Sequence, residues 1–222
     1  MSIILNLETA TKNCSVAIAK DGDLLASREF AAEGYSHAEK LHVFINEVLS
    51  ESRIEFGEIS AIAVSRGPGS YTGLRIGVSA AKGLCYALNI PLLAIDTLEI
   101  LAAKVDIKDG LIVPMIDARR MEVYSAIFNA SGDRVRDIEA EILTAESYSA
   151  SSQKLYFIGD CQEKVNTLLK NDNFIFLPDI IYPSATGMVK LSAERFKNKQ
   201  FEDVAYFEPF YLKDFIAGGK TL

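Results

Sequence analysis

The sequence predicts an α/β protein of two lobes, each repeating a β-β-β-α-β-α unit. Apolar runs rich in β-branched residues, typical of buried strands, alternate along the chain with helical patterns. The order of elements predicted for the first half recurs in the second half. With 222 residues, 49% of them hydrophobic, the chain can bury about 70% of its unfolded surface. We expect a first lobe over residues 1–106 and a smaller, less regular second lobe over residues 107–222, whose C-terminal segment can pack back on the first.

The first half is predicted to hold five strands and three helices. Asp21 and Gly22 form the turn of a hairpin between the second and third strands. A third helix begins at Asp96 or Thr97, since either side chain can cap a helix start. The other predicted elements are strands over Ile3 to Glu8, Cys14 to Lys20, Asp23 to Phe30, Ile59 to Ser65 and Leu92 to Ile95, with helices over Ser36 to Ser50 and Thr72 to Leu88.

The second half repeats this opening in pattern rather than in identity. Its turn residues are Ser131, Gly132 and Asp133. The predicted strands are Leu111 to Asp117, Glu122 to Phe128, Arg134 to Ile142, Leu155 to Ile158 and Phe174 to Leu177, with helices over Asp160 to Leu169 and Thr186 to Phe196. Two such copies are the pattern of the actin, sugar-kinase and heat-shock-chaperone superfamily, whose two lobes embrace a cleft.

Charge and cysteine content limit the classes of function. The formal charge of −7 repels polyanions, which argues against a chain that binds nucleic acid by itself. The three cysteines form no C-x-x-C pair and are odd in number, which favours free thiols in a reducing compartment. No uncharged run is long enough to span a bilayer, so we expect a cytoplasmic protein without a membrane partner. Three small basic groups are predicted to be solvated surface: Arg119 with Arg120, Arg134 with Arg136, and Lys197 with Lys199.

The most informative stretch runs from Ala61 to Gly77, where a buried strand turns sharply into a helix. Its glycines allow positive φ, and Ser70 or Thr72 can cap the new helix, whose start attracts anions. The stretch is not a P-loop, because leucine and arginine stand where lysine and a hydroxyl are required. A dinucleotide-binding turn is an alternative, with Asp96 as the ribose acid, but the third glycine comes one residue late and a proline removes one amide.

Arg66 to Gly77 closely resembles the signature of the bacterial TsaB (YeaZ-like) family. The resemblance covers residues 3–101, is thin between about residues 131 and 207, and departs from the family pattern at Glu8, Ala38 and Tyr71. It rests on the segments N-L-E-T-A-T-K-N-C-S-V-A-I, S-H-A-E-K-L, I-P-L-L-A-I-D-T-L, D-A-R-R-M-E-V-Y and P-F-Y-L-K.

This resemblance implies a scaffold or activator subunit that is not an enzyme by itself. It implies a complex that transfers a threonylcarbamoyl group to the adenosine next to the tRNA anticodon, together with a catalytic paralogue of the same fold (TsaD-like) and an ATPase subunit (TsaE-like). It further implies a homodimer when the chain is alone, tRNA contact only through the complex, and no cofactor bound alone, with ATP or ADP possible at the junction with the paralogue. The alternative is a small-molecule kinase or nucleotide-hydrolysing enzyme of the same superfamily.

Two early helices are the expected partner interface. Both have broad apolar faces, for which burial in the chain's own core is the default interpretation. The family resemblance implies in addition an intersubunit face, on which Leu74 and Val78 are taken to point outward. The residues assigned to this face are His37, Leu41, Phe44, Ile45, Tyr71, Leu74, Arg75, Val78, Ala81 and Lys82.

A second set of residues is expected near the cleft or a nucleotide. Glu8 and Asp117 occupy equivalent positions in the two halves and could pair across the cleft. Alternatively, these carboxylates cap turns or pair with Arg119 and Arg66. The full set is Glu8, Thr9, Arg66, Gly67, Gly69, Ser70, Asp117, Arg119 and Glu122.

No metal ligand or catalytic residue is predicted. The only histidines, His37 and His42, are five residues apart, which separates them by about 140° around a helix and prevents shared metal binding. A peptidase is disfavoured, because no histidine lies near Ser65, Ser70 or Cys85 to activate a nucleophile.

Overall fold

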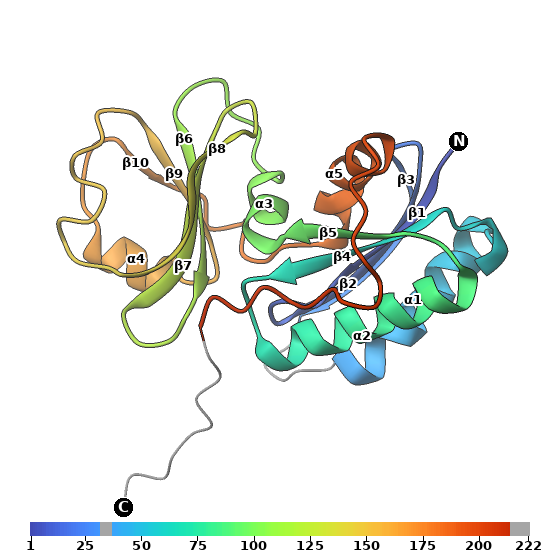
Figure 1. The fold of residues 1–222 in the computed structure, drawn as a ribbon. Coiled ribbons are helices and arrows are strands. Elements are labelled where there is room, and N and C mark those ends of the chain that lie inside the picture. The colour runs from blue at the N-terminus through green and yellow to red at the C-terminus, as the bar shows by residue number, and fades with distance from the viewer. Residues whose placement is uncertain (32–36, 214–222) are drawn as a thin grey trace, which may run out of the picture.

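The computed structural model describes residues 1–31 and 37–213, which form two lobes, each built on a five-stranded mixed sheet (Figure 1). The first sheet has the order β3-β2-β1-β4-β5 and the second β10-β9-β6-β7-β8. The strands of the first are β1 (Ile3–Glu8), β2 (Asn13–Lys20), β3 (Asp23–Ala31), β4 (Ala61–Gly67) and β5 (Leu92–Asp96). Those of the second are β6 (Leu111–Asp117), β7 (Glu122–Asn129), β8 (Arg134–Ile142), β9 (Leu155–Gly159) and β10 (Phe174–Phe176).

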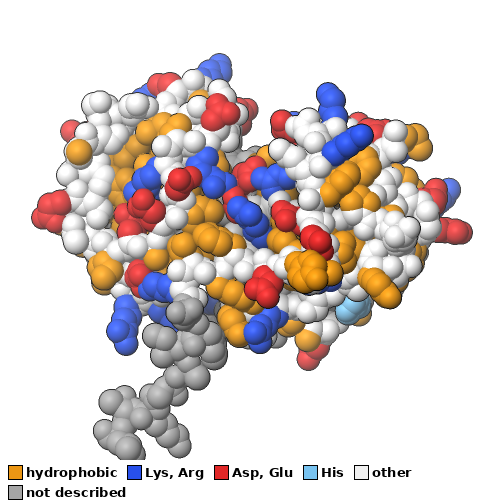
Figure 2. All heavy atoms as spheres, in the orientation of Figure 1, with side chains coloured by type: hydrophobic (Ala, Val, Ile, Leu, Met, Phe, Trp, Pro, Cys, Tyr) orange, Lys and Arg blue, Asp and Glu red, His pale blue; other side chains and the backbone are white. Residues whose placement is uncertain are grey.

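The two sheets share one topology. In each, the first strand is central, pairs antiparallel with the second and parallel with the fourth, so β6, β7 and β9 correspond to β1, β2 and β4. The predicted fold class, a duplicated two-lobed architecture of the actin, sugar-kinase and heat-shock-chaperone type, is confirmed. The second unit departs from the predicted β-β-β-α-β-α order, because residues 143–154 connect β8 to β9 without a helix. Figure 2 shows that side chains of both charges gather where the lobes meet.

Helices cover the sheets and complete the cores. Both α1 (His37–Ser52) and α2 (Tyr71–Leu88) lie against one face of the first sheet, and α5 (Ala185–Lys197) packs on β1 and β2 from the other (Figure 1). The short α3 (Thr97–Ala102) contacts both sheets, and α4 (Gln162–Leu168) packs on β9. A 3₁₀ turn, η1 (Phe56–Glu58), precedes β4. No helix among residues 1–31 and 37–213 is long and apolar enough to cross a membrane.

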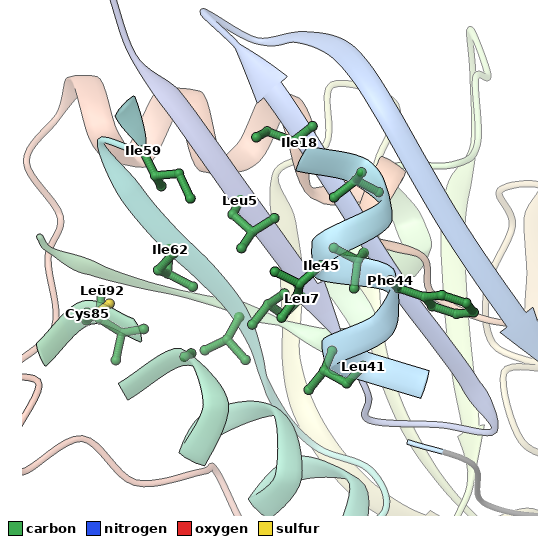
Figure 3. Close-up of a cluster of buried hydrophobic side chains, with 14 of the residues drawn as sticks. Leu5, Leu7, Ile18, Leu41, Phe44, Ile45, Ile59, Ile62, Cys85 and Leu92 are labelled. Atoms are coloured by element: carbon green, nitrogen blue, oxygen red, sulfur yellow. The ribbon is translucent and has the colours of Figure 1, made fainter. Parts of the chain in front are cut away.

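Most of the apolar stripes of α1 and α2 belong to the core of the first lobe. Leu5 and Leu7 from β1 meet Leu41 and Ile45 from α1 in a layer with less than 3% exposure (Figure 3). Cys85 of α2 closes the same layer. Full burial of one such aliphatic side chain contributes about 2 kcal/mol. The default interpretation of these helices as core is therefore confirmed, and their apolar stripes are not free for a partner.

After α5, residues 202–213 form a strap that returns across the first lobe to the second (Figure 1). The Glu202 amide donates to the Leu92 carbonyl at 2.9 Å, and the Phe210 amide donates to the Arg66 carbonyl at 2.6 Å. Lys213 forms an ion pair with Glu122 on β7. The strap thus joins the lobes by hydrogen bonds at its first-lobe end and an ion pair at its second-lobe end.

The Ser36 start of the first predicted helix lies outside the described residues. Elsewhere, helix and strand ends agree with the sequence prediction to within two residues. The three cysteines are buried and none is paired. Burial raises the pKa of the Cys14 and Cys85 thiols to about 11, which keeps both protonated at neutral pH.

Candidate functional site at the glycine turn and the interlobe cleft

The glycine turn packs against the first hairpin of its own chain. Ser70 caps α2 by accepting a hydrogen bond from the Gly73 amide at 3.2 Å. Its own amide donates to the Ala10 carbonyl at 2.6 Å, and the Thr9 hydroxyl donates to the Gly73 carbonyl at 2.8 Å. The turn between β1 and β2 is therefore bonded directly to the first turn of α2.

Three glycines make this approach possible. A Cβ atom at Gly69 would lie 2.3 Å from the Ala10 carbonyl oxygen, and one at Gly73 would lie 2.1 Å from the Thr9 carbonyl oxygen. At Gly77 it would lie 2.2 Å from the Thr9 hydroxyl. Only glycine allows backbones to approach this closely. Gly73 and Gly77 therefore serve packing inside the lobe, and their four-residue repeat does not mark an intersubunit contact.

Glu8 ends β1 with its carboxylate fully buried. Its Oε1 accepts a hydrogen bond of 2.6 Å from the Ala10 amide, and its Oε2 has no hydrogen-bond partner among the described residues. Burial raises the pKa of Glu8 to about 7, since desolvation disfavours the charged form. The turn of β1 and β2 thus directs an amide at its own carboxylate rather than outward at a ligand.

Asp117, at the equivalent end of β6, makes the same contact. Its Oδ1 accepts hydrogen bonds from the Arg119 amide at 2.7 Å and from the Lys164 ammonium at 2.7 Å. Each carboxylate is used within its own lobe, so the structure shows the turn-capping alternative and not a pair across the cleft. Glu122, the third acid expected near the cleft, pairs with Lys213 of the strap.

Asp96 joins the two lobes. Its carboxylate, 2% exposed, accepts from Arg66 Nε at 2.5 Å and from the guanidinium of Arg134 on β8. Arg66 therefore pairs with neither Glu8 nor Asp117, which was one of the alternatives for these two carboxylates. Both Asp96 oxygens are thus engaged by arginines, and the buried carboxylate does not offer the open acceptor that a ribose-binding acid provides. The sequence offered no sign of this contact, since Arg134 lies 38 residues away in the chain.

A cleft of about 550 Å³ opens between the lobes. Gly69, Ser70, Asp117 and Arg119 line it, as expected, whereas Glu8, Thr9, Arg66, Gly67 and Glu122 do not. The expected set is therefore divided between the cleft and the packing beneath it. Residues that the sequence analysis did not place in the cleft also line it, among them Lys12, Tyr124, Asp160, Tyr182, Tyr211 and Lys213.

Known proteins are similar in sequence to this chain over nearly its whole length. A family model described as TsaD, tRNA N6-adenosine threonylcarbamoyltransferase, matches residues 31–217. The tRNA threonylcarbamoyladenosine biosynthesis protein TsaB of Bacillus subtilis is 35% identical over 95% of this chain and 93% of that protein. The chain belongs to the TsaB family. The Escherichia coli protein of the same name is 28% identical over 98% of this chain and 97% of its own.

A solved TsaB-family structure agrees with this fold. YeaZ from Pseudomonas aeruginosa aligns with a TM-score of 0.82 at 26% identity and covers 96% of this chain and 100% of its own. The family resemblance stated from the glycine-turn signature is therefore confirmed. The thin region between residues 131 and 207 lies within these alignments, so the second lobe is common to the family as well.

The histidines of this TsaB-family chain lie apart. His37 is buried, and its Nε2 donates to the Thr11 carbonyl at 2.8 Å, while burial lowers the pKa of its imidazole. His42 is exposed. In the parts of the chain that the structure describes, no three His, Cys, Asp or Glu side chains come together as metal ligands. His37 thus ties the start of α1 to the first hairpin.

The expected interface residues divide sharply by burial. Leu74 is 1% exposed and Val78 is 4% exposed, so the prediction that they point outward is wrong. Helix α2 packs this side on β4, because its apolar positions recur every three to four residues. His37, Leu41, Phe44, Ile45 and Ala81 are also buried, whereas Tyr71, Arg75 and Lys82 reach the surface.

Apart from Arg75, the outward face of these helices consists of residues that the sequence analysis did not assign to an interface. The buried positions of α2 leave Arg75, Ser79, Gly83 and Tyr86 outward. On α1, Val43 is 48% exposed. Once the buried stripe of each helix is known, helical spacing places these residues on the opposite side, toward solvent. We define the exposed helix face as Val43, Arg75, Ser79, Gly83 and Tyr86.

Proposed function

We propose that this TsaB-family protein is a non-catalytic scaffold or activator subunit in threonylcarbamoyladenosine formation on tRNA. The complex transfers a threonylcarbamoyl group to the adenosine beside the anticodon. A catalytic paralogue of the same fold binds this chain, an ATPase subunit joins them, and tRNA is held by the assembly. The names of its relatives support a part in threonylcarbamoyladenosine formation. The geometry of its own cleft supports a non-catalytic role.

One observation carries the scaffold role. Glu8 and Asp117 each accept the amide two residues on, so both hairpins that flank the cleft direct an amide at their own carboxylate. In nucleotide-hydrolysing proteins of this fold, such turns bind phosphate and leave an acid free for chemistry. Here the amide that a phosphate would need at either turn is already bound to a carboxylate, and that carboxylate would repel the phosphate. This arrangement disfavours catalysis in the cleft.

The exposed helix face is the proposed docking surface for the catalytic paralogue. Ser79 is exposed, a Cβ atom at Gly83 would meet nothing within 4 Å, and Val43 adds exposed apolar area. Small residues allow a partner helix to approach closely, and α2 bears Arg75 and Lys82 with no acid in its sequence. A homodimer through the same face is proposed for the chain alone. ATP or ADP is proposed only at the junction with the paralogue.

A matched pair of substitutions tests this assignment. Ser79→Arg places a charge on the exposed helix face, and Ser152→Arg places the same residue on an exposed loop of the second lobe. We expect Ser79→Arg to weaken association with the catalytic paralogue about tenfold or more and to reduce tRNA modification in proportion, with Ser152→Arg like wild type. Sedimentation and mass spectrometry of tRNA nucleosides measure both effects.

Two results would contradict the proposal in different ways. Normal assembly and modification with Ser79→Arg would move the docking surface elsewhere. Turnover of Mg-ATP by the isolated chain, lost in Asp117→Asn, would replace the scaffold by the alternative, a kinase or nucleotide-hydrolysing enzyme. Asp117→Asn in the complex is otherwise expected to leave modification within about twofold of wild type, because it removes no transition-state contact.

A further inference from the structure

The tip of the β6–β7 hairpin holds two arginines in an unusual conformation. Arg119 and Arg120 have φ of 73° and 53°, in the four-residue connection between β6 and β7, where such left-handed conformations ordinarily favour Gly, Asn or Asp. Left-handed backbone costs about 1 kcal/mol or more for each residue with a side chain. The Lys164 ammonium of α4 stabilises the turn by donating to the Arg120 carbonyl at 2.9 Å and the Glu122 carbonyl at 2.8 Å. The hydrogen bonds that hold the turn are therefore made by its backbone, and neither guanidinium group takes part in them.

The side chains of these two arginines make no polar contact with the part of the chain that the structure describes. Neither the Arg119 nor the Arg120 guanidinium forms a hydrogen bond or ion pair with any residue in ranges 1–31 and 37–213. Lys12 lines the same cleft from the first lobe and is likewise exposed and unpaired within those ranges. Two acids line the cleft: Asp117 is already paired with Lys164, and Asp160 accepts a hydrogen bond from the Asp117 amide. A locally positive mouth therefore stands on a protein whose formal charge is −7.

Aromatic side chains line the cleft behind these cations. Four of the nine tyrosines are there: Tyr71, Tyr124, Tyr182 and Tyr211. The rings of Tyr71 and Tyr211 lie with centroids 4.9 Å apart, and Arg75 lies over Tyr71 at 4.2 Å. Tyr211 remains 36% exposed. Exposed rings beside arginines are what single-stranded RNA uses for base stacking, whereas an acidic peptide needs only the charges.

We propose that the hairpin tip, Lys12 and the tyrosines of the cleft bind the single-stranded anticodon loop of tRNA, an inference that rests on the proposed function. The guanidinium groups contact loop phosphates, and Tyr211 offers a ring to an unpaired base. The contact is weak for the isolated chain, because the net charge of the molecule opposes it. In the assembly it orients the loop whose adenosine is modified.

Fluorescence anisotropy with a labelled anticodon stem-loop RNA tests the inference on the full chain without any partner. We expect binding near 10⁻⁵ M at about 50 mM salt. The double variant Arg119→Gln with Arg120→Gln should weaken binding about tenfold. It should also reduce the slope of log K against log salt by about 1.4, the change expected for the loss of two phosphate contacts. Lysine at both positions should retain the slope. The matched control, Lys197→Gln with Lys199→Gln, removes two exposed cations from the end of α5 and should change binding less than about twofold.

Tyr211→Leu separates stacking from charge. It should weaken binding with the salt slope unchanged, whereas Tyr211→Phe should bind like wild type. Thermal melting of each variant establishes that it folds. The proposal is overturned if wild-type chain does not bind the stem-loop, if the glutamine pair binds like wild type, or if free ADP displaces the RNA completely, since the cleft would then be a mononucleotide site.

The same variants distinguish this inference from the scaffold assignment. Loss of RNA binding by the glutamine pair, with normal association with the catalytic paralogue, supports the RNA contact whatever Ser79→Arg does. If the glutamine pair instead binds RNA normally but no longer associates with the catalytic paralogue, the hairpin tip is a contact for an acidic protein surface and the proposal is overturned.

Discussion

Thr9 and Gly73 are joined by a hydrogen bond of 2.8 Å from the Thr9 hydroxyl to the Gly73 carbonyl, and the same glycine leaves no room for a Cβ atom beside the Thr9 carbonyl. The contact links the first hairpin to the start of α2 across 64 residues of sequence. The glycine at this position is therefore required by packing between two segments of the same chain.

Gly73→Ala should destabilise the fold strongly. The added methyl would lie 2.1 Å from the Thr9 carbonyl oxygen, so either the hairpin or α2 must move, at a cost of about 3 kcal/mol. Gly83→Ala is the matched control on the same helix, where the methyl meets nothing within 4 Å and should stabilise by about 0.5 to 1 kcal/mol. Urea unfolding measures both. Equal stability of the two variants would contradict the packing role.

Leu74→Arg should prevent folding rather than association. Leu74 is 1% exposed in the core of the first lobe, and a buried unpaired guanidinium costs more than about 4 kcal/mol. Ser79→Arg introduces the same residue on the exposed side of α2 and should melt within a few degrees of wild type. Circular dichroism distinguishes them. A folded, monomeric Leu74→Arg protein would restore the outward orientation predicted from the sequence.

Glu8 should make stability depend on pH near neutrality. Burial raises its pKa to about 7, from an ordinary value of 4.5, so the folded state holds this proton more tightly than the unfolded state does. Its contribution is therefore full below about pH 4.5 and is lost as the pH rises through 7. Glu8→Gln mimics the protonated form and should be more stable than wild type by about 3 kcal/mol at pH 8, with little difference at pH 5.

Urea unfolding of both proteins across this pH range measures the effect. The difference between the two curves isolates Glu8, because His37 and other titrating groups are common to both. A constant difference from pH 5 to pH 8 would show that Glu8 keeps the same charge throughout.

Asp96→Asn should weaken the junction of the lobes. The Asp96 carboxylate, 2% exposed, binds Arg66 and Arg134, and its loss leaves two partly buried guanidinium groups underpaired at a cost of about 2 to 3 kcal/mol. Asp109→Asn breaks an exposed ion pair with Lys154 and should cost less than about 0.5 kcal/mol. Thermal unfolding and small-angle scattering report stability and interlobe arrangement. An unchanged Asp96→Asn protein would mean that the strap and the packing of α3 against the second sheet hold the lobes together without this ion pair.

Much of the architecture could be predicted, because the signals that carry it are local. The alternating and helical patterns placed Ile3–Glu8, Leu111–Asp117 and Arg134–Ile142 without error, and the Asp21-Gly22 turn joins β2 and β3 as a hairpin. The segment between Arg66 and Gly77 was sufficient to indicate the family. Periodicity and turn chemistry act over a few residues, so one sequence is enough to read them.

The duplicated fold, the family and the apolar stripes of α1 and α2 could therefore be predicted from local patterns. Which side of each helix faces the sheet follows from the packing of the lobe, so Leu74 is core and Ser79 is surface. The tertiary structure also decided that Glu8 binds the Ala10 amide and that Asp96 pairs with Arg134. These contacts depend on distances between segments far apart in the chain, and such distances are fixed by packing the two sheets and their helices together rather than by any local preference.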